Sequence, residues 1–272
     1  MPGPSDPGNP FLRVVEGVGR GTVRGVESVG FGANLLSQSV YWLFLGRRRH
    51  QPVRAAPVFA EMMQVGIGAV PIVSMLSLTI GVMLAIQGID ALEPFGAEHQ
   101  VVIGVALSVT REFAPLITGI LVAGRSGSAL AARLGTMTIS SEIDALKVMG
   151  VNPVRFLVVP SLIAMIVMLP ALTLWSDLLA LLGAGLFVSA ELGMTMAAYV
   201  DQTLRYLDAE DVMHGLTKSA IFAVLITLIG VANGSAVSGG AEGVGRVTTR
   251  SVVQAITAIV LTDMLFVFAT TR

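Results

Sequence analysis

Residues 111–153 read REFAPLITGILVAGRSGSALAARLGTMTISSEIDALKVMGVNP. This stretch begins in an apolar run (113–123), passes through the small residues GRSGS (124–128) and continues into a short charged segment that stops at Gly150 and Pro153. Because Gly and Ser cluster in turns, we predict that residues 124–128 end the apolar helix. The chain then becomes apolar again. The polar segment is too short to be a domain and lies between two runs that are apolar enough to cross a membrane. This arrangement indicates a membrane protein that docks a soluble partner.

The composition supports a membrane protein. The 272 residues are 54% hydrophobic and 13% charged, with a mean hydropathy of +0.79. A soluble domain carries roughly 25% charged residues, so most of this chain is expected to face lipid. The net charge of −1 gives no basic field that would attract nucleic acid. The absence of Cys excludes thiolate metal sites, and we find no motif of a catalytic centre.

Five apolar runs are long enough to cross a bilayer, which takes about 20 residues. They cover residues 62–89, 101–123, 154–187, 216–237 and 252–270. The third run is longer than one span needs and contains Pro160, Pro170 and Asp177. It is compatible with one long tilted helix or with two short ones, which would make six spans. We favour five and predict an all-α integral membrane protein.

The distribution of Lys and Arg predicts the orientation. Basic residues gather before the first run, between the second and third, and between the fourth and fifth, whereas the other two connections are acidic. With five spans this places the N-terminus inside and the C-terminus outside. Six spans would instead place Arg246 and Arg250 outside.

The N-terminal region is expected to lie outside the spans. Residues 1–10 are polar and Pro-rich, which predicts a disordered end. Residues 11–60 are interpreted as an interfacial amphipathic helix and an elbow, because Val14, Val18, Val26 and Val29 recur at near-helical spacing among charged residues. The glycines between them leave a loose segment as the alternative. Residues 61–272 would form the five-span domain.

Charged residues that fall inside the apolar runs other than the third are Arg111, Glu112, Lys218 and Asp263. A charge at the centre of a membrane helix costs about 3 kcal/mol on insertion scales, so such residues usually face a cavity or a partner. Lys218 and Asp263 lie at similar depth under the predicted topology and could pair. Two interpretations stay open: structural pairs, with Arg111 beside Glu112, or a direct role in substrate passage.

Residues 138–149 predict an amphipathic cytoplasmic helix. Ser140 or Ser141 would cap it, Glu142 and Asp144 would occupy its first turn, and Gly150 would end it. Its apolar stripe consists of Ile143, Leu146 and Met149. Docking into a groove of a soluble partner is favoured over lying on the membrane. Residues 238–250, SGGAEGVGRVTTR, predict a flexible or tightly turned loop, with a second cytoplasmic contact as the alternative.

Three segments carry a resemblance to a known family: REFAPLITGILVAGRSGSALAARLG, EIDALKVMGVNP and GGAEGVGRVTTRSVV. Over roughly residues 35–272 the chain resembles the MlaE/YrbE permeases, the membrane subunits of MCE-type ABC lipid transporters. The resemblance implies a homodimer in the bacterial inner membrane, an ABC ATPase dimer below it and a periplasmic MCE-domain lipid-binding protein above it. It also implies a phospholipid substrate and no cofactor on this chain, with ATP and Mg on the ATPase.

The resemblance also implies roles for particular residues. The coupling helix falls on residues 138–149, and Glu142 is the expected ATPase contact, supported by the stripe Ile143, Leu146 and Met149 and by Arg246. The lipid cavity would involve Leu84, Leu92 and Phe95, with Asp263 nearby. The family's internal charges match Arg111, Glu112, Lys218 and Arg246. An ion-coupled carrier that uses the intramembrane charges as a relay is the main alternative, and a non-transporting scaffold is a second one.

Overall fold

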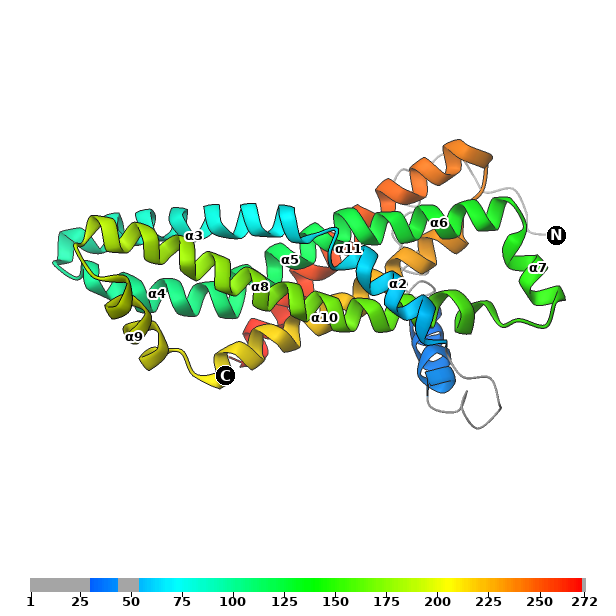
Figure 1. Cartoon of the computed structure of the whole chain (residues 1–272). Helices are drawn as coiled ribbons and strands as arrows, with labels where there is room; N and C mark the ends of the chain where they lie inside the picture. Colours follow the sequence, from blue (N-terminus) through cyan, green and yellow to red (C-terminus); the bar gives the residue numbers. More distant parts are fainter. Residues whose placement is uncertain (1–29, 44–53, 271–272) are drawn as a thin grey trace, which may run out of the picture.

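The computed structural model describes residues 30–43 and 54–270, and these residues form helices joined by short turns, without a strand among them (Figure 1). Residues 30–43 are helical. The predicted disordered end (1–10), most of the predicted interfacial helix and part of the elbow lie outside the described residues. The described chain is therefore an all-α protein, as predicted.

Five helical stretches of the described chain are long and apolar enough to cross a membrane. They are Val70–Phe95, Glu98–Ile139, Val154–Glu191, Ala209–Ser235 and Gly240–Thr270. This confirms the five-span prediction. The third stretch is continuous through Pro170, so the alternative with two short helices is wrong.

The stretches are divided as labelled in Figure 1. The elements before the third stretch are α2 (Ala55–Val65), α3 (Val70–Leu92), the 3₁₀ turns η1 (Glu93–Phe95) and η2 (Glu98–Gln100), α4 (Val101–Ser108), the π-helical turn η3 (Val109–Phe113), α5 (Ala114–Val122), the π-helical turn η4 (Ala123–Gly127), α6 (Ser128–Ile139) and α7 (Glu142–Val148). The remaining elements are the π-helical turn η5 (Val154–Val158), α8 (Val159–Glu191), α9 (Met196–Tyr206), α10 (Ala209–Ser235) and α11 (Gly240–Thr270).

The predicted turn at residues 124–128 does not exist, because the helix continues through it to Ile139. Its small residues serve helix packing instead. A Cβ added to Gly127 would lie 2.8 Å from Ile226 Cγ2, and one added to Gly230 would lie 3.2 Å from the Gly127 carbonyl oxygen. These glycines let α10 approach η4 closely, as small residues do between membrane helices.

The predicted loop at residues 238–250 is also wrong, because α11 begins at Gly240 and includes the rest of this segment. Gly239 and Gly240 take positive φ values of 88° and 69°, which glycine adopts readily, and they make the turn that leads into α11. Within the new helix, Arg246 Nη1 lies 3.1 Å from Glu242 Oε1, an ion pair at the i, i+4 spacing that supports helix.

The predicted first span (62–89) also needs correction, because its first residues belong to a separate helix. The α2 helix ends at Val65 and a turn precedes α3, which begins at Val70. Gly66 and Gly68 lie in this turn. The chain therefore changes direction at the start of the first span instead of entering it straight from the elbow.

The core is built on direct backbone contact between α3 and α8. A Cβ added to Gly81 would lie 1.9 Å from the Ala180 carbonyl oxygen, and one added to Gly183 would lie 2.4 Å from that of Leu78. Next to these contacts the hydroxyls of Ser77 and Ser176 lie 2.7 Å apart, buried. Helices that touch through glycine in this way are typical of membrane bundles, where burial of apolar area does not drive association.

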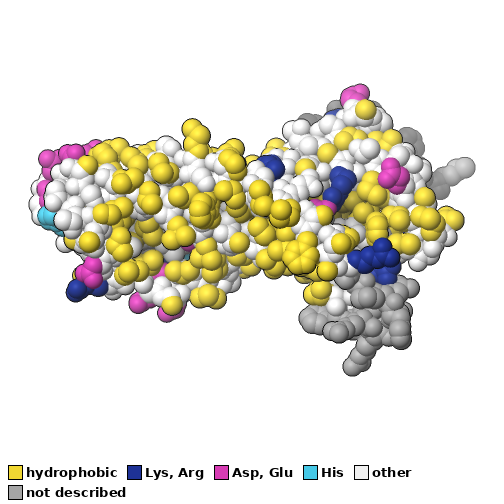
Figure 2. Space-filling model, in the orientation of Figure 1, with side chains coloured by type: hydrophobic (Ala, Val, Ile, Leu, Met, Phe, Trp, Pro, Cys, Tyr) yellow, Lys and Arg dark blue, Asp and Glu magenta, His cyan; other side chains and the backbone are white. Residues whose placement is uncertain are grey.

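The outer surface of the bundle is apolar (Figure 2). Hydrophobic side chains cover most of the face shown, and acidic side chains gather at the end where α3 meets α4. The large apolar side chains of α11 are among the exposed ones: Val253, Val260, Leu261, Met264, Leu265 and Phe268. An apolar exterior of this kind suits lipid or another protein in the membrane.

Candidate functional site

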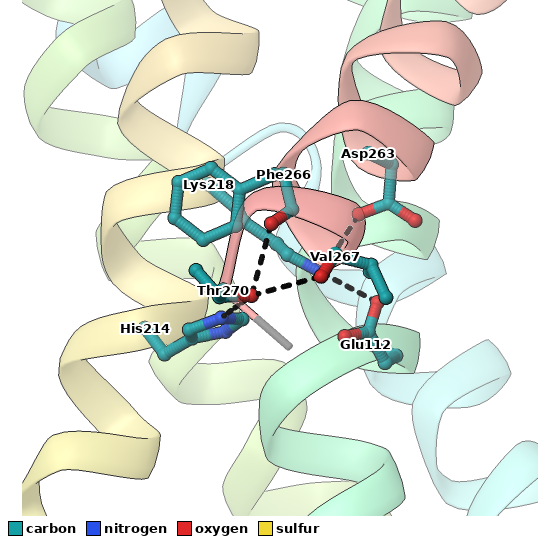
Figure 3. A network of polar contacts seen from close by, with 7 residues as sticks. All are labelled: Glu112, His214, Lys218, Asp263, Phe266, Val267 and Thr270. Atoms are coloured by element: carbon teal, nitrogen blue, oxygen red, sulfur yellow. Dashed lines mark hydrogen bonds and ion pairs between the residues drawn. The ribbon is translucent and has the colours of Figure 1, made fainter. Parts of the chain in front are cut away.

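Three ionisable side chains meet between the helices: Glu112 from η3, Lys218 from α10 and Asp263 from α11 (Figure 3). We call them the buried network after Lys218, since the Glu112 side chain is 36% exposed. The Lys218 side chain is 0% exposed, and its Nζ donates to Glu112 Oε2 at 2.5 Å. Nζ also lies 3.0 Å from Asp263 Oδ1, an ion pair without hydrogen-bond alignment. Lys218 and Asp263 therefore do pair, and one buried ammonium serves two carboxylates.

Arg111 and Glu112, for which a structural role in helix packing is one of the two interpretations, both bind α10. Arg111 Nε donates to Asp211 Oδ1 at 2.5 Å, while Glu112 binds Lys218. The π-helical turn η3 holds both residues at the α10 surface. Such turns are often found at functional sites of helices.

Asp211 is a site residue that the sequence interpretation missed. Besides binding Arg111, its Oδ2 accepts the Asp208 backbone N–H at 3.0 Å, and both halves of a capping box are present at the start of α10. The signal was the acidic pair Asp208 and Asp211, three residues apart before an apolar run. Asp211 thus fixes the start of α10 and neutralises Arg111.

Close backbone packing brings α10 to the network. A Cβ added to Gly215 would lie 2.3 Å from the Thr110 carbonyl oxygen, so α10 touches η3 at this level. Around the ammonium, Lys218 Nζ lies 5.6 Å from the centroid of the Phe266 ring. His214 Nε2 lies 3.3 Å from Thr270 Oγ1, and its ring packs edge-on against Phe266 at 4.8 Å (Figure 3). The Lys218 ammonium is therefore enclosed by side chains of α10, α11 and η3.

Of the four residues expected at a lipid cavity, the structure brings two together. Leu84 and Leu92 line a cavity of about 290 Å³ between α3 and α4. Phe95 lies in η1 beyond the end of α3, is 80% exposed and does not line this cavity. Asp263 belongs to the buried network on α11 and does not line it either.

Of the expected coupling residues, Glu142, Ile143 and Leu146 lie on α7, which has no buried residue, and Met149 directly follows it. Ile143 and Leu146 are half-buried, whereas Glu142 and Met149 are exposed. The expected serine cap is wrong: Ser141 precedes the helix in a left-handed conformation (φ 59°) and its side chain makes no capping bond. Ser140 Oγ instead donates to Glu142 Oε1 at 2.7 Å.

The predicted end of this helix is confirmed. Gly150 has a φ of 76°, and the Val151 N–H donates to the Leu146 carbonyl at 2.9 Å, which is the bond of a glycine-closed helix. Arg246 lies apart on α11, 66% exposed and paired with Glu242.

The chain matches the family described as Permease MlaE over residues 58–269. It is 32% identical to a probable ABC transporter permease protein of Rickettsia typhi, over 94% of this chain and 96% of the relative. It is 37% identical to a probable ABC transporter permease protein of Synechocystis, over 68% of this chain and 70% of the relative. It is 30% identical to the intermembrane phospholipid transport system permease protein MlaE of Haemophilus influenzae, over 80% of this chain and 82% of the relative. The chain therefore belongs to the MlaE permease family.

Proposed function

We propose that the chain is the permease subunit of an ABC transporter that moves phospholipids between the inner membrane and a periplasmic MCE-domain carrier. The observation that carries the proposal is the family match over residues 58–269 on a five-span bundle. The Haemophilus influenzae relative, named as a phospholipid transport permease, supports the substrate class. ATP hydrolysis belongs to a separate ATPase dimer in this proposal, so the chain is a transporter subunit without a cofactor of its own.

The transported lipid would enter the apolar cavity between α3 and α4. At about 290 Å³ this cavity lies at the lower limit of ligand pockets, which hold about 300–1,000 Å³ for drug-sized molecules. A whole phospholipid needs more room. The large apolar side chains exposed on α11 offer a surface on which a second copy of the chain can pack. This is our reason to propose a homodimer.

Movement of the ATPase would reach the bundle through α7. This helix follows directly on α6, the end of the 42-residue stretch that also carries Glu112. It presents Glu142 and Met149 at its surface, and Val148 beside them is 89% exposed. A short exposed helix with charged and apolar groups suits a groove in a soluble partner. The distribution of basic residues supports a cytoplasmic position for it.

The first test identifies the partners. The tagged full-length chain would be purified gently from its native membrane and the co-purifying proteins identified by mass spectrometry. Stoichiometric ATPase and MCE-domain subunits are expected. If the chain came out alone, undegraded and in good yield, the proposal would fail and an ion-coupled carrier using the intramembrane charges would replace it.

A second test examines coupling through α7. The change Glu142→Lys reverses a charge at the proposed ATPase contact, so we expect lipid-stimulated ATPase activity of the purified complex to be lost. Glu191→Lys is the matched control, because Glu191 is also exposed but ends α8, away from α7. Unchanged stimulation in Glu142→Lys would count against α7 as the coupling element.

A further inference from the structure

A second cavity, distinct from the one between α3 and α4, lies where α2 meets η4, α6 and α8. We call it the α2 cavity, and it has a volume of about 240 Å³. Its charged lining residues are Glu61 from α2, Arg125 from η4 and Arg133 from α6. Apolar groups, among them Val65 and Met165, make up much of the remaining wall. Two guanidinium groups against one carboxylate leave this cavity with a net positive charge.

The two arginines are held in different ways. Arg133 Nη1 pairs with Glu61, and its Nη2 donates to Ser161 Oγ at 3.2 Å, while its buried Nε has no partner among the described residues. Arg125 is exposed and makes one bond within the described chain, from Nη1 to the Gln64 carbonyl at 3.1 Å. A guanidinium offers five N–H donors, so several donors of Arg125 are free to bind a ligand.

The backbone is shaped to accommodate Arg125. A Cβ added to Gly68, in the turn between α2 and α3, would lie 2.0 Å from Arg125 Nη2. The guanidinium therefore rests against the glycine backbone, in space that any other residue would fill. Gly68 does not need glycine for its φ, because no positive φ is recorded there among the described residues. The close approach of the Arg125 guanidinium therefore explains why this position holds a glycine.

The depth of the cavity matches a lipid headgroup. From Glu98 to Arg125 the second stretch runs 27 residues, about 40 Å at 1.5 Å per residue. A bilayer with its headgroup regions is about 40–45 Å thick, so Arg125 lies at headgroup level when Glu98 lies at the opposite surface. On α2 and just after it, Phe59, Met63 and Ile67 are 64%, 59% and 57% exposed. This apolar stripe places α2 in the same interfacial layer.

We propose that the α2 cavity binds the phosphate of a phospholipid from the leaflet that surrounds α2, with Arg125 as the main donor. Guanidinium binds phosphate through paired N–H groups, and the apolar wall accepts the upper part of the acyl chains. The bound lipid fastens α2 to the second and third spans. It is a resident of the bundle rather than cargo, so the site does not depend on the transport proposed above.

The test measures lipid binding to the purified, delipidated full-length chain by native mass spectrometry. The probes are dioleoylphosphatidylglycerol and dioleoylglycerol, which share acyl chains and differ in the phosphate headgroup. The wild-type chain is expected to bind the first saturably and with clear preference. Arg125→Ala should weaken that binding about tenfold, the effect of losing a charge-assisted hydrogen bond. Equal binding of both probes, or an unchanged affinity in Arg125→Ala, would overturn the proposal.

Two further variants separate position from charge. Gly68→Leu keeps every charge but displaces the guanidinium, so it should weaken phosphatidylglycerol binding as Arg125→Ala does; wild-type affinity here would contradict the site. Arg205→Ala removes an exposed arginine of α9 that pairs with Asp201 outside the cavity, and it should bind as the wild type does. A general loss in Arg205→Ala would show that bulk charge controls binding. If inorganic phosphate competed with phosphatidylglycerol at equal affinity, the ligand of the site would be a free anion rather than a lipid.

Discussion

The buried network and the α2 cavity contain the same kinds of group but are built in opposite ways. In the buried network, Lys218 is fully enclosed and two carboxylates satisfy it. In the α2 cavity, Arg133 is 38% exposed and paired with one carboxylate, and Arg125 keeps free donors. A closed set of charges braces helices, whereas an open set can bind something else. Charge inside a membrane bundle therefore has to be judged by how many of its partners are already present.

The largest effect is expected from Lys218→Met. The change leaves Asp263, 15% exposed, and the half-buried Glu112 without their shared cation. Breaking a buried pair from one side costs about 3–5 kcal/mol, which sets the upper limit of the expected loss. The free energy of unfolding in mixed detergent micelles measures this loss. The triple variant with Glu112→Gln and Asp263→Asn should recover most of it, since no uncompensated charge remains. A Lys218→Met chain as stable as the wild type would show that the network is no brace.

A change from glycine to alanine should lower thermal stability much more at Gly215, beside the buried network, than at Gly68, beside the α2 cavity. Gly215→Ala forces a Cβ to 2.3 Å from the Thr110 carbonyl oxygen, so helix backbones must move apart, at a cost of about 1–3 kcal/mol. Gly68→Ala meets only the end of a flexible arginine and should cost little. Thermal unfolding midpoints of the two variants test this difference. Equal shifts would mean that the two regions are equally rigid.

Asp211→Ala should give the next effect, because it removes one half of a capping box and the partner of Arg111. A lost helix cap costs about 1 kcal/mol, and the exposed Arg111 adds little to it. Hydrogen exchange should show fraying confined to the first turn of α10. Asp208→Ala removes the other half of the box and leaves the Arg111 pair, so the difference between the two variants isolates the ion pair.

The smallest effects on the free energy of unfolding are expected from a change of glutamate to glutamine, made once in the buried network and once in the α2 cavity. Glu112→Gln removes a charge that faces a fully buried ammonium and should cost about 1 kcal/mol, because Asp263 remains as a partner. Glu61→Gln faces a partly exposed guanidinium and should cost less, about 0.2–1 kcal/mol. Unfolding in graded detergent mixtures at low and high salt distinguishes them, since the pair of Arg133, whose side chain is 38% exposed, should respond more to salt than the pair of Lys218, which is 0% exposed.

The sequence predicted the five spans because lipid contact requires long apolar runs whatever the packing inside. It failed where a residue has two possible uses. The glycines near residues 127 and 240 indicate turns by their local preference. Gly127 instead allows α10 to pack closely, and Gly240 begins α11. Local preference cannot show which neighbour a small residue will meet.

The candidate site was predicted only in part for a similar reason. The pair Lys218 and Asp263 followed from equal depth in neighbouring spans, and the structure has it. The binding of Glu112 to the same lysine depends on the π-helical turn η3, which no pattern in the sequence indicates. The α2 cavity was missed because its three charged residues come from separate segments that meet only after α2 folds back on the bundle.

The helical stretch Glu98–Ile139 has a mechanical consequence. At 1.5 Å per residue its 42 residues form a rod about 63 Å long, with η3 about a third of the way along and α6 at the far end. A tilt of about 5° about one end displaces the other by about 5 Å, roughly one helical turn. The π-helical turns η3 and η4 divide the rod into segments, each turn being a place where the angle can change without breaking the helix. A tilt of this stretch would therefore convert a small rotation at one membrane surface into a displacement at the other.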